Sequence, residues 1–430
     1  MTIKKSSFLL TALLIPVLFV HAQDYEICHW LNDRSSATIM TFDDYSPAHW
    51  EIGIPALERE ALPGTFFVTI SNIWHSGHYQ IMNDAISNGI EIGFHTDTHP
   101  NLTQLNNEQL QTELVDSKIS FDSNLTNPTL TMAYPFGSFN NTVIEKTKEE
   151  HIAARTVFQP SGGDWEYEFA STENDYFKIP TKAVNSSLSL QAYKNEVISG
   201  MNTGGMVVFM YHSIYNDQGD GDTWFDAIHE DDFQDQLDYL QTVKEQTWVT
   251  TFSNAVRYHK EQHCATLSTI ENTSSHLTMS LTDTLSNDII YNQPLTIKLN
   301  VGPLERYTSI TQNGDEVTYT LSDNENYYLI NLIPDGGDII LAKDQTLAIE
   351  PATSNDSRFQ AFPIPSTSTI TIKSKIVIDN IRIVDNQGRE VSGVTRLGKH
   401  TMSIESLSDG LYFALISSVD GVYSVPFIKN

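Results

Sequence analysis

The feature that most constrains the fold is a repeated pattern between about residues 36 and 251. Short apolar runs, rich in β-branched and aromatic residues, alternate with polar loops or with segments of helical spacing. This alternation predicts a parallel sheet with helices outside it, either open or closed into a barrel. We expect strands at Ala37–Met40, Thr65–Ile70, Ile90–Phe94, Thr129–Ala133, Met206–Met210 and Thr247–Thr251. A helix is expected from about residue 107, with Asn106 or Asn107 as N-cap.

Beyond Cys264 the pattern changes. Strands with period-two alternation, such as Leu295–Leu299 and Val317–Leu321, are separated by Asn-Gly-Asp and Pro-Asp-Gly-Gly turns, which predicts a small β-sandwich. We therefore expect an α/β domain at 23–265, a β-sandwich at 266–345, a polar linker at 346–358 and a third module of short strands at 359–430.

Residues 1–22 have the pattern of a secretory signal peptide. Two lysines precede an apolar run at 8–20, and cleavage is expected after Ala22. A membrane anchor is the alternative, but the run is shorter than the roughly 20 residues that span a bilayer, and Pro16 interrupts it. No later segment is apolar enough to span a membrane, so we expect an exported protein without a transmembrane segment.

Cysteine usage leaves the redox state of the chain open. Cys28 and Cys264, the two cysteines of the chain, would either form a bridge that closes the first domain or remain as thiols. The absence of a CxxC motif excludes a cysteine zinc cluster.

The charge of the chain limits its partners. With 54 acidic against 25 basic residues, the formal charge is −29, which argues against nucleic acid as a partner. Such a surface tolerates neutral or cationic polymers, and it also fits a role in solubility alone.

Two motifs follow expected strands and suggest a metal site. Asp43 and Asp44 come after the first run, and His95 and His99 come after the third. Two histidines four residues apart can reach a single ion, and one carboxylate completes three ligands while a fourth position stays open for water, as a catalytic zinc requires. Taken singly, the acid pair has the alternative of a turn former and the histidine pair that of surface residues.

Two further motifs follow strands. In the segment from Ala133 to Gly137, Pro135 and Gly137 predict a turn whose backbone N–H groups can form an oxyanion hole. His212 follows the run at 206–210, where a histidine can act as general acid. An ordinary turn and a packed or capping histidine are the alternatives.

In order along the chain, these motifs resemble those of the NodB-homology polysaccharide deacetylases, carbohydrate esterase family 4. The resemblance covers residues 36–262 and is carried by Thr41–Asp44, His95–Pro100, Ala133–Gly137 and Tyr211–Ser213. It implies a distorted (β/α) barrel as catalytic domain, and the strand patterns beyond Cys264 predict two small all-β sandwich domains after it. It also implies a groove for a glycan chain.

The resemblance also implies roles for individual residues. Asp44, His95 and His99 would hold Zn²⁺ or another divalent cation such as Co²⁺. Asp43 would be the general base and His212 the general acid, and the backbone N–H of Phe136 would stabilise the oxyanion.

The sequence departs from the family pattern at three places. Many members carry an arginine before the proline of the third motif, where this chain has Ala133 and Tyr134; we expect Arg155 to take over the task of orienting the base. The fourth motif is echoed by Asp164 and Trp165, which we count with Tyr134 among the residues near the substrate. Ser213 stands where an aspartate often follows the histidine.

The last segment resembles the C-terminal sorting domain of the Bacteroidetes type IX secretion system. The resemblance rests on Asn380–Val391, Leu407–Phe413 and Phe427–Asn430. It implies that secretion machinery is a partner and that the protein is secreted or held at the cell surface. A plain β-sandwich is the alternative.

Together these features predict a secreted hydrolase of carbon–nitrogen bonds other than peptide bonds. It would remove N-acetyl groups from a β-linked N-acetylhexosamine polysaccharide or oligosaccharide, as in chitin or peptidoglycan. O-deacetylation of a polymer such as acetylated xylan is the second enzymatic reading. A glycan-binding protein that has lost catalysis is the third.

Overall fold

The computed structural model describes residues 25–73, 75–157, 164–165, 172–301, 306–323, 326–344, 350–351, 358–386, 388–418 and 421–430. The expected signal peptide at 1–22 lies outside these residues, as does most of the expected linker at 346–358. Across the described ranges, no helix combines the length and apolarity needed to cross a membrane.

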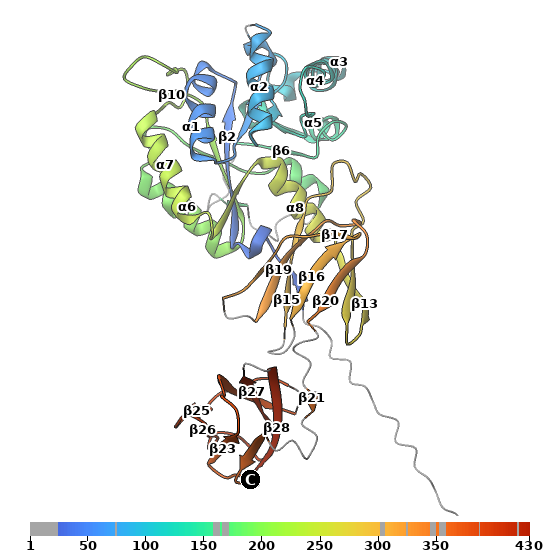
Figure 1. The fold of residues 1–430 in the computed structure, drawn as a ribbon. Coiled ribbons are helices and arrows are strands. Elements are labelled where there is room, and N and C mark those ends of the chain that lie inside the picture. Colours follow the sequence, from blue (N-terminus) through green and yellow to red (C-terminus); the bar gives the residue numbers. More distant parts are fainter. Residues whose placement is uncertain are drawn as a thin grey trace, which may run out of the picture.

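Parallel strands form the centre of the first domain (Figure 1). They are β2 (Ser36–Asp43), β3 (Thr65–Val68), β4 (Glu91–Phe94), β5 (Thr131–Ala133), β6 (Ala153–Arg155), β8 (Lys182–Ala183), β9 (Met206–Tyr211) and β12 (Thr247–Thr250). β6, β5, β4, β3, β2 and β9 are neighbours in that order, and β12 also pairs with β2.

A short segment closes the strands into a distorted barrel. β8 pairs in parallel with β9, and Ile179, which lies just before β8, forms a parallel bridge with Arg155 at the end of β6. All eight residues of β2 are buried, as expected of a strand that is covered on both faces. The expected α/β barrel class is confirmed.

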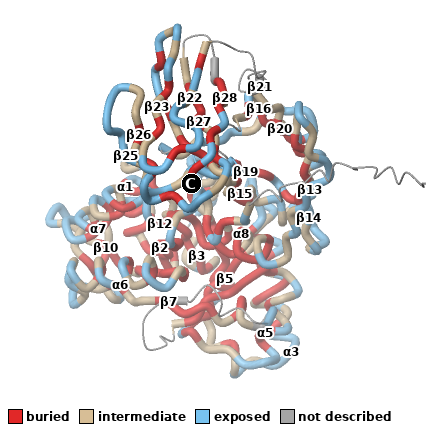
Figure 2. The backbone as a smooth tube through the Cα atoms, turned by 90° about the horizontal axis from the view of Figure 1, so that it is seen from below, coloured by how far each residue is buried: buried red, intermediate tan, exposed pale blue. Residues whose placement is uncertain are grey.

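Helices surround this barrel, and the buried strands lie inside them in Figure 2. The helices are α1 (Ile54–Glu60), α2 (Gly77–Ser87), α3 (Asn107–Gln111), η5 (Thr112–Asp116), α4 (Ser117–Asp122), α5 (Asn141–Thr147), α6 (Leu190–Thr203), α7 (Glu230–Val243) and α8 (Phe252–Cys264). The expected start of α3 is confirmed, because Asn106 and Gln109 form a capping box there.

The middle module is a pair of antiparallel sheets. One contains β1 (Tyr25–Ile27), β15 (Leu295–Asn300), β19 (Tyr327–Leu332) and β18 (Tyr319–Leu321). The other contains β13 (Thr266–Asn272), β14 (His276–Thr282), β20 (Ile339–Lys343), β16 (Tyr307–Gln312) and β17 (Asp315–Glu316). Alternate residues of β14 and β19 are buried, as the period-two pattern predicts. The strand expected at 317–321 begins two residues later, at Tyr319.

The N-terminal strand belongs to the sheet of the middle module and not to the barrel. β1 pairs antiparallel with β15, so Tyr25 lies opposite Leu299 and Ile27 lies opposite Ile297. The barrel and the middle module also share one continuous hydrophobic core. The N-terminal end of the 23–265 segment is therefore held by a strand outside it.

Hydrogen bonds extend this junction. The Tyr258 hydroxyl on α8 donates to the carbonyl of Cys28 at 2.9 Å and accepts the N–H of Thr296 at 3.3 Å. Cys28 and Cys264 are both free thiols, so the alternative without a bridge holds. Burial raises the pKa of the Cys28 thiol well above its usual range.

The C-terminal module has its own core and two four-stranded sheets. One contains β21 (Glu350–Pro351), β28 (Gly421–Lys429), β27 (Gly410–Ser418) and β24 (Asn380–Asp385). The other contains β22 (Phe359–Phe362), β23 (Thr369–Ser374), β26 (Thr401–Ser403) and β25 (Thr395–Arg396). The expectation of a second small all-β domain is confirmed.

Candidate metal centre

The predicted chemical groups meet at the carboxyl ends of the barrel strands. Asp43 is the last residue of β2, His95 follows β4, Arg155 ends β6 and His212 follows β9. Parallel strands bring these ends to one rim of the barrel, where loops expose side chains that the strands hold rigidly.

Asp44, His95 and His99 form a compact set of potential metal ligands. Asp44 Oδ1 lies 3.4 Å from Nε2 of His95 and 3.4 Å from Nε2 of His99. One ligand atom from each of the three residues lies within 4.8 Å of the others. Two imidazole nitrogens and one carboxylate oxygen are a donor set that suits zinc and leaves a position open.

A backbone carbonyl selects the nitrogen that His95 presents to this site. Nδ1 of His95 lies 2.8 Å from the carbonyl oxygen of Ala133. A carbonyl only accepts hydrogen bonds, so Nδ1 of His95 donates there, and Nε2 is the nitrogen that faces Asp44.

The charge balance favours an ionised Asp44. Burial alone would raise its pKa, but a hydrogen bond and the charge of His95, with the charges of His212 and His99, hold the pKa well below its usual range. Burial, together with the charge of His95, lowers the pKa of His99. An ionised carboxylate is the form of Asp44 that binds a cation.

The backbone of the site is strained at several non-glycine residues. Asp44, Thr96, His99 and Phe136 have φ values of 75°, 68°, 58° and 58°. Left-handed conformations of this kind cost of order 1 kcal/mol or more each, and they cluster at functional sites. The Asn72 side-chain amide donates to the carbonyl of Asp44 at 2.6 Å and so helps to hold Asp44 in its left-handed conformation.

Sequence reasoning missed Glu113, which holds the loop between the two histidines. Its carboxylate, on η5, accepts the N–H groups of Asp97 and Thr98 at 3.0 Å each and the Thr98 hydroxyl at 2.6 Å. No local pattern marks this residue, because its partners lie on a different segment.

Asp43 forms a buried ion pair with Arg155. The Arg155 side chain is fully buried, and its guanidinium carbon lies 5.0 Å from the centre of the Phe67 ring. Burial lowers the pKa of Arg155 to about 9, so the guanidinium is still charged at neutral pH. The structure places Arg155 where it can orient the carboxylate of Asp43.

His212 lies on the other side of Asp43. Its Nε2 is 3.9 Å from Asp43 Oδ2, and Nε2 of His95 is also 3.9 Å from that oxygen. Burial lowers the pKa of His212 to about 3, and the charges of Arg155 and His95 act in the same direction. The imidazole is therefore neutral at neutral pH.

The remaining predicted residues differ in their placement. Phe136 is exposed, with its ring centre 4.7 Å from that of His99. Tyr134 does not line the site: its side chain is 1% exposed and packs against Phe139, so the expectation that it lies near substrate is corrected. Asp164 and Trp165 form β7, antiparallel to β9, but their side chains lie outside what the structure describes.

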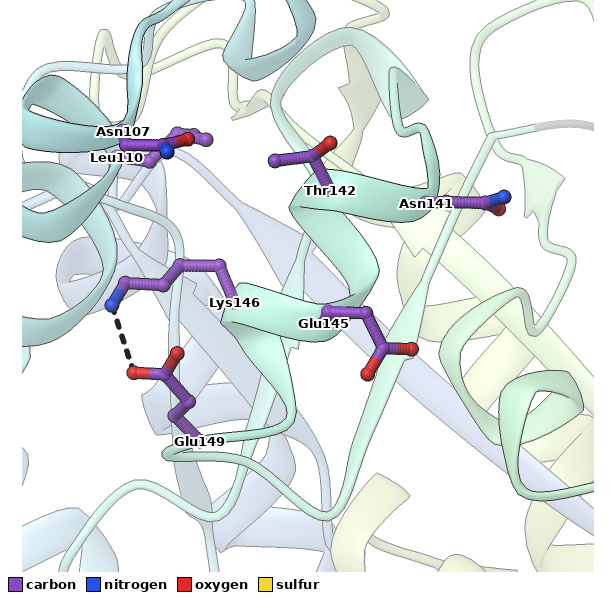
Figure 3. Close-up of a pocket in the computed structure, with 7 residues that line it drawn as sticks. All are labelled: Asn107, Leu110, Asn141, Thr142, Glu145, Lys146 and Glu149. Carbon is purple, nitrogen blue, oxygen red and sulfur yellow. Dashed lines mark hydrogen bonds and ion pairs between the residues drawn. The ribbon is translucent and has the colours of Figure 1, made fainter.

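A cavity of about 500 Å³ lies elsewhere, between α3 and α5. Figure 3 shows its seven lining residues, of which Lys146 and Glu149 form an ion pair at 2.8 Å. None of the predicted site residues lines it.

Two family models match parts of the sequence. Residues 32–154 match the family model for polysaccharide deacetylases, and residues 360–430 match that for secretion system C-terminal sorting domains. The sequence is 26% identical over 340 residues to a gellan lyase of Bacillus sp., covering 75% of this chain and 13% of the relative. It is 29% identical over 157 residues to YxkH of Bacillus subtilis (strain 168), which bears the name of a polysaccharide deacetylase, covering 36% of this chain and 54% of the relative.

One similar solved structure has a TM-score of 0.36 and 17% sequence identity. It is the Xyl-CE4 domain of a multidomain xylanase from the hindgut metagenome of Trinervitermes trinervoides. The match covers 51% of this chain and 89% of that one. Of the two curated relatives, the match spans only 13% of the length of the gellan lyase and 54% of the length of YxkH.

The fold and the site define an α/β-barrel protein with a candidate metal centre at the carboxyl ends of its strands. Its barrel domain is similar to the polysaccharide deacetylases over residues 32–154, and its last module is similar to secretion system C-terminal sorting domains over residues 360–430.

Proposed function

We propose that this protein is a metal-dependent deacetylase that acts on the N-acetyl groups of a β-linked N-acetylhexosamine polysaccharide or oligosaccharide. The observation that carries the proposal is the arrangement of Asp44, His95 and His99 within 4.8 Å of one another, beside a second carboxylate, Asp43, that is not needed as a ligand. The family match at residues 32–154 supports the same reaction class.

The ligand set fits Zn²⁺ or a similar divalent ion such as Co²⁺. Bound there, the ion would polarise the acetyl carbonyl and lower the pKa of a coordinated water. Asp44, His95 and His99 would hold it, and Glu113 and the Ala133 carbonyl would keep the histidines in place.

Asp43 is placed to act as general base. Arg155 pairs with one of its oxygens, Oδ1, and the other, Oδ2, faces His95 and His212. The guanidinium offsets the charge of the buried carboxylate and fixes its orientation. Asp43 would accept the proton of the attacking water.

His212 would deliver a proton to the departing nitrogen. Because its imidazole is neutral at neutral pH, it must first receive the proton that it donates, and Asp43 lies 3.9 Å away. The backbone N–H of Phe136, on the strained turn after β5, would donate to the oxyanion. Asp164 and Trp165 stay proposed neighbours of the substrate.

O-deacetylation of a polymer such as acetylated xylan is the second candidate, because the same groups would serve an ester carbonyl. A glycan-binding protein without catalysis is the third; the buried pair of Asp43 and Arg155 disfavours it, because a buried ion pair has to offset a large desolvation cost.

We also propose that the protein is secreted or displayed at the cell surface. The sorting domain at 360–430 points to export through secretion machinery. The expected signal peptide at residues 1–22 would start that route.

Metal analysis combined with an acetate-release screen tests the proposal. Purified full chain is dialysed against chelator, reloaded with Zn²⁺ or Co²⁺, and incubated with N-acetylglucosamine oligomers and with acetylated xylan. We expect about one ion per chain and metal-dependent acetate release from the oligomers. Release from xylan alone would favour O-deacetylation, and no release from either polymer would contradict a deacetylase.

A further inference from the structure

Two exposed aromatic side chains lie beside the candidate general acid. Phe225 is 58% exposed, and its ring meets the His212 ring edge-on with 4.8 Å between centroids. Trp224, the preceding residue, is 60% exposed. Large apolar rings that stay in contact with water next to a reactive group are typical of a binding surface.

The loop that carries these rings is anchored. The buried Asp222 carboxylate accepts the Ser213 hydroxyl at 2.5 Å and the N–H of Trp224 at 3.1 Å through Oδ1, and the N–H of Ala48 at 3.1 Å through Oδ2. The Ser213 hydroxyl in turn accepts the N–H of Phe225 at 3.1 Å, and the Ser213 N–H donates to the Phe225 carbonyl at 3.2 Å. Ser213 directly follows His212, so both rings are held in a defined position relative to that imidazole.

The surroundings indicate what binds there. Asp217 and Asp220, on the same loop, are exposed acids, and the whole chain carries a formal charge of −29. An anionic polymer would be repelled. The C–H face of a neutral pyranose ring, in contrast, matches an aromatic surface in shape and polarity.

We propose that Trp224 and Phe225 form an aromatic platform that binds a neutral sugar ring of the glycan chain next to the acetylated unit. The inference rests on the proposed function, which brings a glycan to this rim. Two aromatic rings then border the reacting groups: Phe136 contacts His99, and Phe225 contacts His212. The platform extends the binding surface beyond the reacting sugar.

Kinetics on a long and a short substrate test the platform. Full-chain Trp224→Ala and Phe225→Ala are compared with wild type on the pentamer of N-acetylglucosamine, on acetylated xylan oligomers and on 4-nitrophenyl acetate. We expect kcat/KM to fall about tenfold, mainly through KM, on whichever acetylated oligomer the wild type uses as substrate. This fall should exceed any change on the small ester. Trp224→Phe, which keeps a ring, should recover most of the loss, and Phe362→Ala, an exposed aromatic of the C-terminal module, should have no effect.

An unchanged kcat/KM on the oligomer would overturn the platform. An equal fall on oligomer and ester would also overturn it, because the loop would then support the metal centre and not a distant sugar. Calorimetric titration of metal-free protein with the pentamer and the xylan oligomers separates the two proposals. Binding by wild type that Phe225→Ala weakens supports the platform even if no acetate is released, and absence of binding to either glycan by wild type overturns it.

Discussion

Arg155 on β6 and Ala133 on β5 are direct register partners on neighbouring parallel strands. In the family that the sequence resembles, an arginine that orients the base is expected before the proline of the third motif, where this chain has Ala133 and Tyr134. Here the guanidinium that pairs with Asp43 comes from the adjacent strand, β6.

This relationship predicts the behaviour of Arg155 variants. Arg155→Met leaves Asp43 buried without its cation, so kcat/KM should fall at least about a hundredfold, and stability should fall by about 3–5 kcal/mol. The double variant Ala133→Arg/Arg155→Ala should recover part of the activity that Arg155→Ala loses. Acetate release and urea unfolding measure both effects. Wild-type kcat/KM in Arg155→Met would show that Asp43 does not depend on this pair.

The assigned roles of general base and metal ligand predict different phenotypes for Asp43 and His95 variants. Asp43→Asn should abolish turnover yet keep bound metal, because Asp43 is not needed as a ligand, whereas His95→Ala should lose both. Metal content is measured by elemental analysis beside acetate release. His276→Ala, in β14 of the middle module, controls for adventitious binding. Retained turnover in either site variant would refute its assigned role.

Glu261 predicts a pH-dependent stability at the junction of barrel and middle module. It is buried, accepts the N–H of Gln293 at 2.9 Å, and burial raises its pKa from 4.5 to about 8. The folded state therefore binds a proton that the unfolded state releases, and this stabilising contribution is lost as pH rises from about 4.5 through about 8.

Glu261→Gln removes this titration and keeps a carbonyl acceptor for Gln293. Relative to wild type, its stability should rise across that pH window and exceed wild type by on the order of a few kcal/mol above it. Thermal unfolding between pH 5 and pH 9 measures the difference. A stability difference that is the same at all pH values would show that Glu261 does not titrate in this window.

The pairing of β1 with β15 predicts which fragments fold. A fragment that ends at residue 265 lacks the strand opposite Tyr25–Ile27 and the Thr296 N–H that Tyr258 accepts. It should be less soluble and unfold at lower temperature than a fragment that ends at residue 344. Soluble yield and calorimetry compare the two, and equal melting temperatures would show that the barrel does not need the middle module.

Much of the fold and of the candidate site could be predicted from sequence, because the signals are local. Buried strands read as apolar runs, and acids or histidines directly after such runs must lie at one rim of a parallel barrel. Asp43, Asp44, His95, His99 and His212 lie together there, as that reasoning predicts.

Tertiary structure decided what local patterns do not encode. Whether Arg155 reaches Asp43 depends on the register of β5, β6 and β2, and whether Glu113 supports the histidine loop depends on how η5 packs. Tyr134 directly follows β5, as His95 follows β4, yet its side chain is buried in the core. The sequence pattern alone does not show which residues after a strand turn inward. The sequence determined which residues stand at the barrel rim, and long-range packing determined which of them face one another.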